Sequence, residues 1–273
     1  MEAIVLDPGG SLRRAFGLLR LLGEGGAAGL RLTELAQAAA LPPATVHRLM
    51  RLMMTERLVT FDPASKHYRL GLELFLLAAQ ASNPLGLRDL ARPGLLRLTA
   101  ELNETLFLLV HNGYDAVCID RSSGPWPIRS FTGDIGGRVP LGMGQGSVAI
   151  LAFLPDAEQD EIIRHNTPRL RQLAPFSEGW LRRELLRVRS EQVSGGLYPV
   201  NPGMAGLAVP IRDGTGRAVA ALSIGTTAER LDAERRAGAR EALMREAALV
   251  EAGLNPFDPS LHRAAAAMEP VSR

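Results

Sequence analysis

A proline-containing turn between two short amphipathic segments is the feature that most constrains the fold of this chain. The spacing of apolar residues predicts a helix over residues 33–40 and another over 43–55, with Leu41-Pro42-Pro43 between them. Proline suits the first turn of a helix, because the N–H that it lacks would have no helical partner there. Two helices joined by so tight a turn are typical of a helix-turn-helix.

The segments on either side complete a small domain. Residues 11–22 carry apolar side chains at helical spacing behind Ser11, which we expect to cap the helix. Downstream, strand-like segments over 58–61 and 66–70 flank the turn sequence Asp62-Pro63-Ala64-Ser65. Three helices followed by a β-ribbon predict a winged helix-turn-helix.

The helix over 43–55 has an apolar face and a polar face. At 100° per residue, the apolar side is formed by Val46, Leu49, Met50 and Met53. The opposite side presents Ala44, Thr45, His47, Arg48 and Arg51, with no acidic residue before Glu56. A surface helix with a purely structural role shows the same division. Hydrogen-bond donors in the first turns nevertheless favour a DNA recognition helix, in which Arg48 and Arg51 pair with guanine.

The expected β-ribbon is basic. Lys66, His67 and Arg69 lie on its second strand, and such side chains on a wing contact phosphate or the minor groove. The alternative is a solvated hairpin. The formal net charge of the chain is only +2, so binding to DNA has to rest on where the basic residues are placed.

The rest of the chain alternates strands and helices. We expect strands over 105–110, 115–121, 128–131, 206–211 and 218–224, and helices over 85–103, 147–153, 156–165, 180–194 and 232–252. Asn112-Gly113 and Asp213-Gly214 are turn sequences of antiparallel hairpins. Hairpins with helices packed around them predict an α+β domain rather than a doubly wound one.

Asn83-Pro84 is the predicted domain boundary, since a proline and the residue before it interrupt a helix. The apolar helix before it, over 72–81, is either a core helix of the first domain or a connector used for dimerisation. We therefore expect a winged helix-turn-helix domain over 1–71, a linker helix over 72–83, and a second domain over 84–256. The tail over 257–273 is expected to be poorly ordered.

The composition excludes several classes of protein. Cys118 is the only cysteine, so the chain has no intramolecular disulfide and no multi-cysteine zinc site, and a buried position in a strand is expected for it. The histidines show no metal-ligand spacing, and neither a metal nor a cofactor is expected. With no signal peptide and no run of about 20 apolar residues, a cytoplasmic protein without membrane contact is expected.

Three local patterns point weakly to other functions. Gly142-x-Gly144-x-Gly146 resembles a dinucleotide fingerprint, but Ser147 stands where the third glycine should be. Ala221-x-Ser223-x-Gly225 resembles the nucleophile elbow of a hydrolase, although alanine replaces its first glycine. The arginine-rich stretch 164–189, a candidate surface for RNA or protein, is interleaved with acids and reads as a solvated helical face. We expect no enzyme.

Several short segments together resemble the IclR family of bacterial transcription regulators. In the first half they are Ser11-Leu12-Arg13-Arg14-Ala15-Phe16, Leu41-Pro42-Pro43-Ala44-Thr45-Val46-His47-Arg48-Leu49 and Tyr68-Arg69-Leu70-Gly71. In the second half they are Leu151-Ala152-Phe153-Leu154-Pro155, Pro202-Gly203-Met204, Ala208-Val209-Pro210 and Ala220-Ala221-Leu222-Ser223. Each is weak alone, and their order and spacing over residues 11–253 make the resemblance specific.

The resemblance implies that the protein regulates transcription, either as a repressor or as an activator. Its second domain is then a GAF-like effector-binding domain, and its partners are a palindromic double-stranded DNA operator and a small organic effector. The family also implies a homodimer or a dimer of dimers. A regulator with a degenerate pocket, which binds DNA without a ligand, is the alternative.

The family further implies an effector pocket at one glycine-rich helix start and on two strands. The residues that match it are Gly144, Gln145, Gly146, Ser147, Gly206, Ser223 and Gly225. Glycines let backbone N–H groups approach a ligand, a helix N-terminus favours an anion, and Ser147 is expected to cap that helix. A tight turn that needs glycines is the alternative.

The pocket departs from the family pattern in three places. Residues 194–201 stand where many members carry an acidic or polar stretch before the Pro-Gly pair. Gly206 stands where a cysteine is frequent, and Gly225 where a second serine is frequent. The pocket is therefore less polar than a sensor of small acids needs, and a larger or more apolar effector is expected. Trp126, Phe131 and Tyr198 are candidates to line it.

Overall fold

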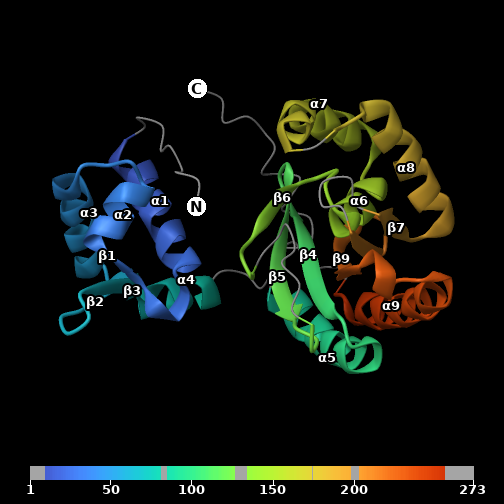
Figure 1. Cartoon of the computed structure of the whole chain (residues 1–273), viewed down its shortest axis with the longest axis horizontal. Helices are drawn as coiled ribbons and strands as arrows, with labels where there is room; N and C mark the ends of the chain where they lie inside the picture. Colours follow the sequence, from blue (N-terminus) through green and yellow to red (C-terminus); the bar gives the residue numbers. More distant parts are fainter. Residues whose placement is uncertain (1–9, 81–84, 127–133, 174, 198–202, 256–273) are drawn as a thin grey trace. The chain divides into compact units, whose positions relative to one another are not determined.

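The computed structural model describes residues 10–80, 85–126, 134–173, 175–197 and 203–255 (Figure 1). The chain divides into two units, Met1–Asn83 and Pro84–Arg273. The strand expected over 128–131 and the tail expected over 257–273 lie outside the described residues.

The first unit combines helices with a small sheet. Its elements are α1 (Ser11–Glu24), η1 (Gly26–Ala28), β1 (Leu30–Arg31), α2 (Leu32–Ala38), α3 (Pro43–Thr55), β2 (Val59–Asp62), β3 (His67–Leu70) and α4 (Leu72–Gln80). The three strands form an antiparallel sheet in the order β1-β3-β2. Leu18, Leu22, Leu35 and Met50 are fully buried and join α1, α2 and α3 in one core. The predicted winged helix-turn-helix is confirmed.

Some details of this unit differ from the sequence-based expectation. Gly10, not Ser11, is the residue before the first turn of α1, so Ser11 does not cap the helix. Strand β1 was not predicted, because two residues are too short for any periodicity. Leu72, Phe75, Leu76 and Leu77 of α4 are exposed in the single chain, so α4 is not a core helix there.

The second unit is built around one sheet. Its elements are α5 (Leu85–Leu102), β4 (Thr105–Asn112), β5 (Asp115–Ser122), β6 (Arg138–Pro140), α6 (Gln145–Ala152), α7 (Asp156–Leu173), α8 (Glu178–Glu191), β7 (Ser194–Leu197), β8 (Met204–Arg212), β9 (Ala218–Thr227), η2 (Ala228–Arg230) and α9 (Ala233–Gly253). The strand order is β6-β5-β4-β9-β8-β7, and every neighbouring pair is antiparallel. This arrangement confirms the predicted α+β class.

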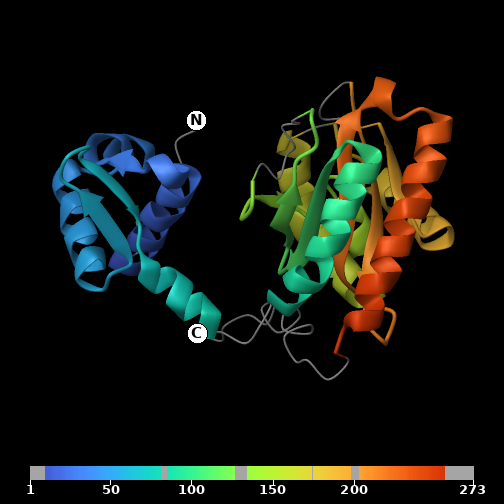
Figure 2. The ribbon, with the colours of Figure 1, turned by 90° about the horizontal axis from the view of Figure 1, so that it is seen from below.

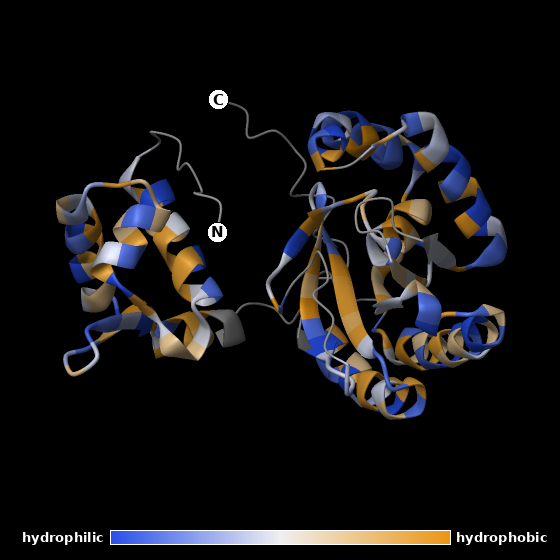
Figure 3. Cartoon of the chain, in the orientation of Figure 1, coloured by the Kyte–Doolittle hydropathy of each residue, from blue (hydrophilic) through white to orange (hydrophobic). Residues whose placement is uncertain are grey.

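Helices cover both faces of this sheet. Helices α5 and α9 lie side by side across one face (Figure 2), where Leu106, Leu222 and Leu243 share a core. Helix α6 packs on the other face against β8 and β9, and α7 and α8 join that second core through Ile162 and Leu185. Strand β4 is hydrophobic along most of its length (Figure 3), as expected of a central strand that is covered on both sides.

The ends of two helices in this unit were predicted wrongly, and two short strands were missed. Helix α7 continues to Leu173 instead of ending near residue 165. Helix α8 ends at Glu191, and the residues that follow form the edge strand β7, for which no strand was expected. Strand β6 was also missed, and at three residues it is too short to show an alternating pattern.

Cys118 lies fully buried in β5, as expected for a small apolar residue. Burial raises the pKa of its thiol to about 12, so the sulfur stays protonated at neutral pH and is a poor nucleophile. Among the described residues, no three acids, histidines or cysteines come together as a metal site. None of the described helices has both the length and the apolar character needed to span a membrane.

Candidate nucleic-acid interface and ligand site

The polar face of α3 points away from the core of the first unit. Val46, Leu49 and Met50 are buried, whereas His47 and Arg48 are exposed. The remaining predicted DNA contacts on this helix are Ala44 and Arg51, which are exposed, and Thr45, which is half-buried. The structure thus brings all five predicted residues of α3 to one surface.

An open hollow of about 310 Å³ lies on this surface, lined by His47, Arg48, Arg51, Leu52 and Thr55. Leu52 was not predicted as a site residue, although 55% of it is exposed among basic neighbours. Basic side chains beside an exposed leucine suit the major groove, where guanine offers acceptors and thymine a methyl group.

Asp62 stabilises the turn between the two strands of the wing, β2 and β3. Its carboxylate accepts hydrogen bonds from the backbone N–H of Ala64 (2.9 Å) and the hydroxyl of Ser65 (2.6 Å). Lys66 closes the turn in the left-handed region with a φ of 61°, and its N–H donates to the Asp62 carbonyl. These bonds hold the exposed Lys66 side chain at the tip of the wing.

The other two predicted wing contacts are engaged within the unit. His67 is half-buried, with Nδ1 2.7 Å from the Ser65 carbonyl. Arg69 donates through Nε to the Ala27 carbonyl (3.0 Å) and through Nη1 to Asp62 (3.5 Å). Only the remaining donors of Arg69 are left for a phosphate.

Acid is expected to loosen the wing at an unusually low pH. The Ser65 hydroxyl, with help from the Ala64 N–H, lowers the pKa of Asp62 from 3.8 to about 2. Because the folded-state pKa is depressed, the contribution of this turn to stability is complete above about pH 4 and is lost as the pH falls through 2. An NMR titration of the Asp62 carboxyl carbon measures this pKa. In Ser65→Ala the pKa should rise toward 3.8, and an unchanged value would contradict the assigned cause.

The predicted effector residues gather on the α6 face of the sheet in the second unit. Gly206 of β8 pairs with Gly225 of β9, and the Gln145 side chain lies over Gly206. A Cβ placed on Gly206 would be 3.1 Å from Cγ of Gln145, and one on Gly146 would be 3.3 Å from Cβ of Ser223. The helix start and the two strands are therefore in contact, as the family resemblance implied.

The glycines and the serine at the start of α6 have distinct roles. Gly142 and Gly144 have φ values of 101° and 92°, which favour glycine. A Cβ on Gly146 would be 2.2 Å from Cδ1 of Leu109, so this glycine lets α6 approach the sheet. Ser147 does not cap the helix, because Gly144 is the capping residue. The buried Ser147 hydroxyl instead donates to the carbonyls of Met143 and Gly144.

Three residues of this region were not predicted from the sequence. Gly196 of β7 pairs with Gly206 and extends the row of glycines across the sheet. Ser194 is buried and donates to Oε1 of Gln145 at 2.5 Å. Thr105 of β4 pairs with Gly225, and its buried hydroxyl has no hydrogen-bond partner among the described residues. A buried hydroxyl without a partner needs an explanation, and a polar atom of a ligand or of a bound water would supply the missing partner.

Trp126 was one of three aromatic residues expected to line the effector pocket, but it does not lie with the other effector residues. Its ring packs under the guanidinium of Arg230 at 5.4 Å, and Arg230 belongs to a cavity that also involves α9. Phe131 and Tyr198 fall outside the described residues.

The weaker alternative readings gain no support from the geometry. Ser223 lies within the sheet between Phe107 of β4 and Ala208 of β8, and 7% of it is exposed, unlike a nucleophile on a sharp turn. In the arginine-rich stretch, Arg182 pairs with Glu178 and Asp160, and Arg187 with Glu184 and Glu191. Internal ion pairs explain these arginines without RNA.

Two family models match the chain. The model described as the bacterial transcriptional regulator IclR C-terminal domain covers residues 79–251, and the IclR helix-turn-helix domain covers residues 11–63. The probable transcriptional regulator SauR of Cupriavidus necator is 27% identical over 226 residues, which are 82% of this chain and 89% of that protein. The transcriptional repressor IclR of Escherichia coli is 28% identical over 155 residues, or 56% of each chain.

Solved structures share the fold across both units. An IclR-type regulator from Alicyclobacillus acidocaldarius has a TM-score of 0.72 at 24% identity, covering 89% of this chain and 98% of that one. An IclR homologue from Microbacterium hydrocarbonoxydans, solved with 4-hydroxybenzoate, has a TM-score of 0.74 at 24% identity, with 90% and 99% covered.

Proposed function

The chain belongs to the IclR family of bacterial transcriptional regulators, and from this premise we propose which residues recognise DNA and what controls them. It is a DNA-binding regulator, not an enzyme. In our proposal Ala44, Thr45, His47, Arg48 and Arg51 enter the major groove of a palindromic operator. Lys66, with His67 and Arg69 beside it, contacts the sugar-phosphate backbone. The observation that carries this proposal is the outward, acid-free face of α3.

Selection of bound sites from a random DNA pool tests this proposal. The purified full-length chain is expected to enrich a palindromic motif, with half-sites about one helical turn apart or a multiple of that. A parallel selection with Arg48→Ala should lose the preference at one base pair of each half-site. Failure of the wild-type chain to enrich any motif, with and without candidate effectors, would contradict sequence-specific recognition through α3.

We further propose that a small organic effector binds on the α6 face of the second unit. The contacts are Gln145, the N–H groups at Gly144, Gly146 and Ser147, and the strand positions Gly206, Ser223 and Gly225. The orphaned hydroxyl of Thr105 and the absence of side chains at Gly196, Gly206 and Gly225, which pair across three strands, support this placement. Because a homologue binds 4-hydroxybenzoate, aromatic acids are the first compounds to test, in line with a larger or more apolar effector.

A large side chain in the row formed by Gly196, Gly206 and Gly225 is expected to abolish the effect of the effector on DNA affinity. A side chain on Gly206 would occupy the space of the Gln145 side chain, so Gly206→Leu should abolish an effector response that typically amounts to about 5–150-fold in DNA affinity. Affinity for the operator without effector should stay the same. Fluorescence anisotropy of labelled operator, with and without a panel of aromatic acids, measures both quantities.

Two further variants make this result interpretable. Gly214→Leu is the matched control, because a Cβ there meets nothing within 4 Å. Gln145→Leu removes the amide at almost constant volume and should weaken the response even if Gly206→Leu folds poorly. A normal response in both Gly206→Leu and Gln145→Leu would place the effector elsewhere. A wild-type chain that binds its operator and ignores every effector would favour the degenerate-pocket alternative.

We propose a homodimer held in part by α4. Leu72, Phe75 and Leu77 are more than half exposed in the single chain. Exposing so much apolar surface to water is unfavourable, and such a surface is typical of a protein–protein interface. Sedimentation equilibrium is expected to give a dimer or a tetramer, and Phe75→Glu should shift it toward smaller species. A wild-type monomer at operator-binding concentrations would contradict this part of the proposal.

A further inference from the structure

A cavity lies on the face of the sheet opposite the proposed effector site. It has a volume of about 240 Å³ and opens where α5 ends, β9 ends and α9 begins. Ile224 of β9 lines it, and Ile224 belongs to the core beneath α5 and α9. Its neighbours Ser223 and Gly225 point to the α6 face, because successive residues of a strand face opposite sides. The two sites are therefore separated by the thickness of the sheet.

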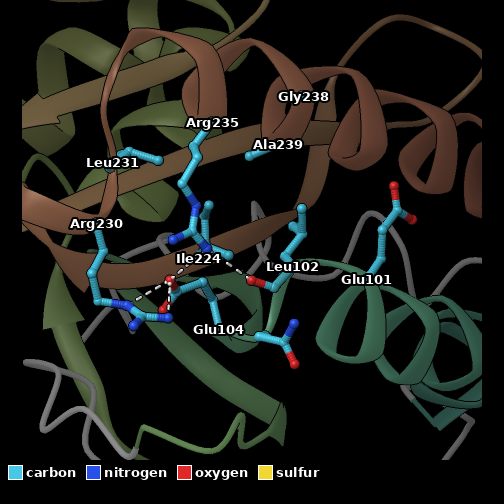
Figure 4. Close-up of a pocket in the computed structure, with 10 residues that line it drawn as sticks. Glu101, Leu102, Glu104, Ile224, Arg230, Leu231, Arg235, Gly238 and Ala239 are labelled. Atoms are coloured by element: carbon cyan, nitrogen blue, oxygen red, sulfur yellow. Dashed lines mark hydrogen bonds and ion pairs between the residues drawn. The ribbon is translucent and has the colours of Figure 1, made fainter.

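Charged groups converge at this cavity around one buried carboxylate. Glu104 is 3% exposed and stands between α5 and β4. Its Oε1 accepts from Arg230 Nε at 3.0 Å and from Arg235 Nη2 at 3.5 Å, and Figure 4 shows the two guanidiniums approaching it from different sides. Its Oε2 is buried with no hydrogen-bond partner among the described residues. Two cations thus share one oxygen, while the second oxygen lacks a donor.

In this cluster neither the two guanidiniums nor the carboxylate has all of its hydrogen-bonding capacity satisfied. Two guanidiniums face a single carboxylate, and 28% and 45% of the Arg230 and Arg235 side chains stay exposed. A pair of arginines with donors to spare binds a ligand carboxylate well, because its two oxygens match planar N–H groups. A buried carboxylate oxygen without a donor is costly, and an incoming hydroxyl or ammonium group relieves that cost.

The rest of the lining is mixed, with Glu101, Asn103 and Gly238 beside four apolar residues. Leu102, Ile224, Leu231 and Ala239 line the cavity, so a short hydrocarbon body fits beside the charged end. At about 30 Å³ for each water-sized group, 240 Å³ holds roughly eight such groups. That is the size of a four-carbon acid with one further substituent.

We propose that this cavity binds a small carboxylic acid that carries a hydroxyl or amino group next to its carboxylate. Arg230 and Arg235 take the carboxylate, and the Glu104 side chain turns so that its Oε2 accepts from the donor of the ligand. This site is separate from the effector site and does not depend on the proposed function, because its binding is measured without DNA. The alternative is a purely structural ion-pair cluster that ties α9 to β4.

The test compares three acids that differ in one group: butyrate, 2-hydroxybutyrate and 2-aminobutyrate. Binding is read from the fluorescence of Trp126 in a Trp180→Phe background, since these are the only two tryptophans and Arg230 lies over Trp126. Saturation-transfer NMR of each acid gives a second, independent reading. We expect saturable binding of 2-hydroxybutyrate or 2-aminobutyrate at millimolar concentration, about tenfold tighter than butyrate.

Two substitutions locate the binding. Gly238 of α9 is exposed, lines the cavity, and has nothing within 4 Å of a Cβ, so Gly238→Phe should block the mouth without a clash in the fold. Gly238→Ala is its matched control. Arg235→Gln should weaken binding about tenfold while the Arg230–Trp126 pair stays in place. Circular dichroism of each variant confirms that it is folded.

Each outcome decides the proposal. Binding that is lost in Gly238→Phe and weakened in Arg235→Gln, but kept in Gly238→Ala, supports it. No saturable signal from any of the three acids up to about 50 mM, by either reading, overturns it in favour of the structural cluster. Binding that both variants retain also overturns it, because the acid then occupies another site. Loss of operator binding in a separate assay would count against the proposed function and leave this result unaffected.

Discussion

Arg48→Ala is expected to weaken operator binding by about 5–150-fold and to relax the preference at one base pair of each half-site. The reason is that a guanidinium paired with guanine O6 and N7 is worth about 1–3 kcal/mol of discrimination against other bases. Arg48 is exposed in the second turn of α3, next to His47 and within one turn of Arg51. Competition binding against every single-base variant of the selected operator measures both effects.

The control separates base reading from loss of a charge. Arg171→Ala removes one cation from the exposed last turn of α7 and should leave the operator profile unchanged. Lys66→Ala is the informative comparison, because a phosphate contact carries no sequence information. It should weaken binding to all sequences alike and reduce the salt dependence by about one unit of slope. If Arg48→Ala kept the base preference of the wild-type chain, Arg48 would not be a residue that recognises a base.

The N-terminal unit was largely predictable because its signals are local. The limits of α3, Pro43–Thr55, agree with the apolar spacing, and the proline at its first position marks its start. The exposure of His47, Arg48 and Arg51 follows from the same periodicity. The engagement of Arg69 by the Ala27 carbonyl does not, since it joins residues 42 positions apart.

Helix α7 shows why some limits could not be predicted. The sequence Asn166-Thr167-Pro168 reads as a helix end, yet the helix passes through it. The amide of Asn166 is buried and donates to the carbonyls of Tyr114 and Leu141, and His165 stacks on the Tyr114 ring. Tertiary contacts thus stabilise a segment whose local preference is to stop.

The residues of the proposed effector site were only partly identifiable from the sequence. Family motifs identified Gln145, Gly206 and Ser223, which the fold brings together. Thr105 and Ser194 carry no local signal, because they join the site only through cross-strand register and the contact with Gln145. Strand β7 contains two consecutive glycines, a composition that disfavours a strand.

Arg217→Met is expected to lower the free energy of unfolding of the second unit by about 3–5 kcal/mol. Arg217 forms a two-bond ion pair with Glu158, and only 14% and 12% of these side chains are exposed. Removing one partner leaves a buried charge without compensation, which costs far more than losing a surface pair. Arg182→Met is the control, because its pairs with Glu178 and Asp160 are about half exposed and worth about 0–1 kcal/mol.

The pH dependence of this loss gives a sharper test, because His111 lies next to the same carboxylate. Burial lowers the pKa of His111, and Arg217 acts in the same direction, against the opposing influence of the Gly113 carbonyl and Glu158. A folded-state pKa below the unfolded value of about 6.5 means that wild-type stability is complete above that pH and falls as His111 is forced to take up a proton.

In Arg217→Met the same protonation becomes favourable. His111 Nδ1 lies 3.7 Å from Glu158 Oε1, so a protonated ring replaces the missing cation. The stability deficit of the variant should therefore shrink as the pH falls from about 7.5 to 5.5, whereas that of Arg182→Met stays flat. Urea unfolding at several pH values measures both deficits. A deficit in Arg217→Met that is independent of pH would show that His111 is not coupled to this ion pair.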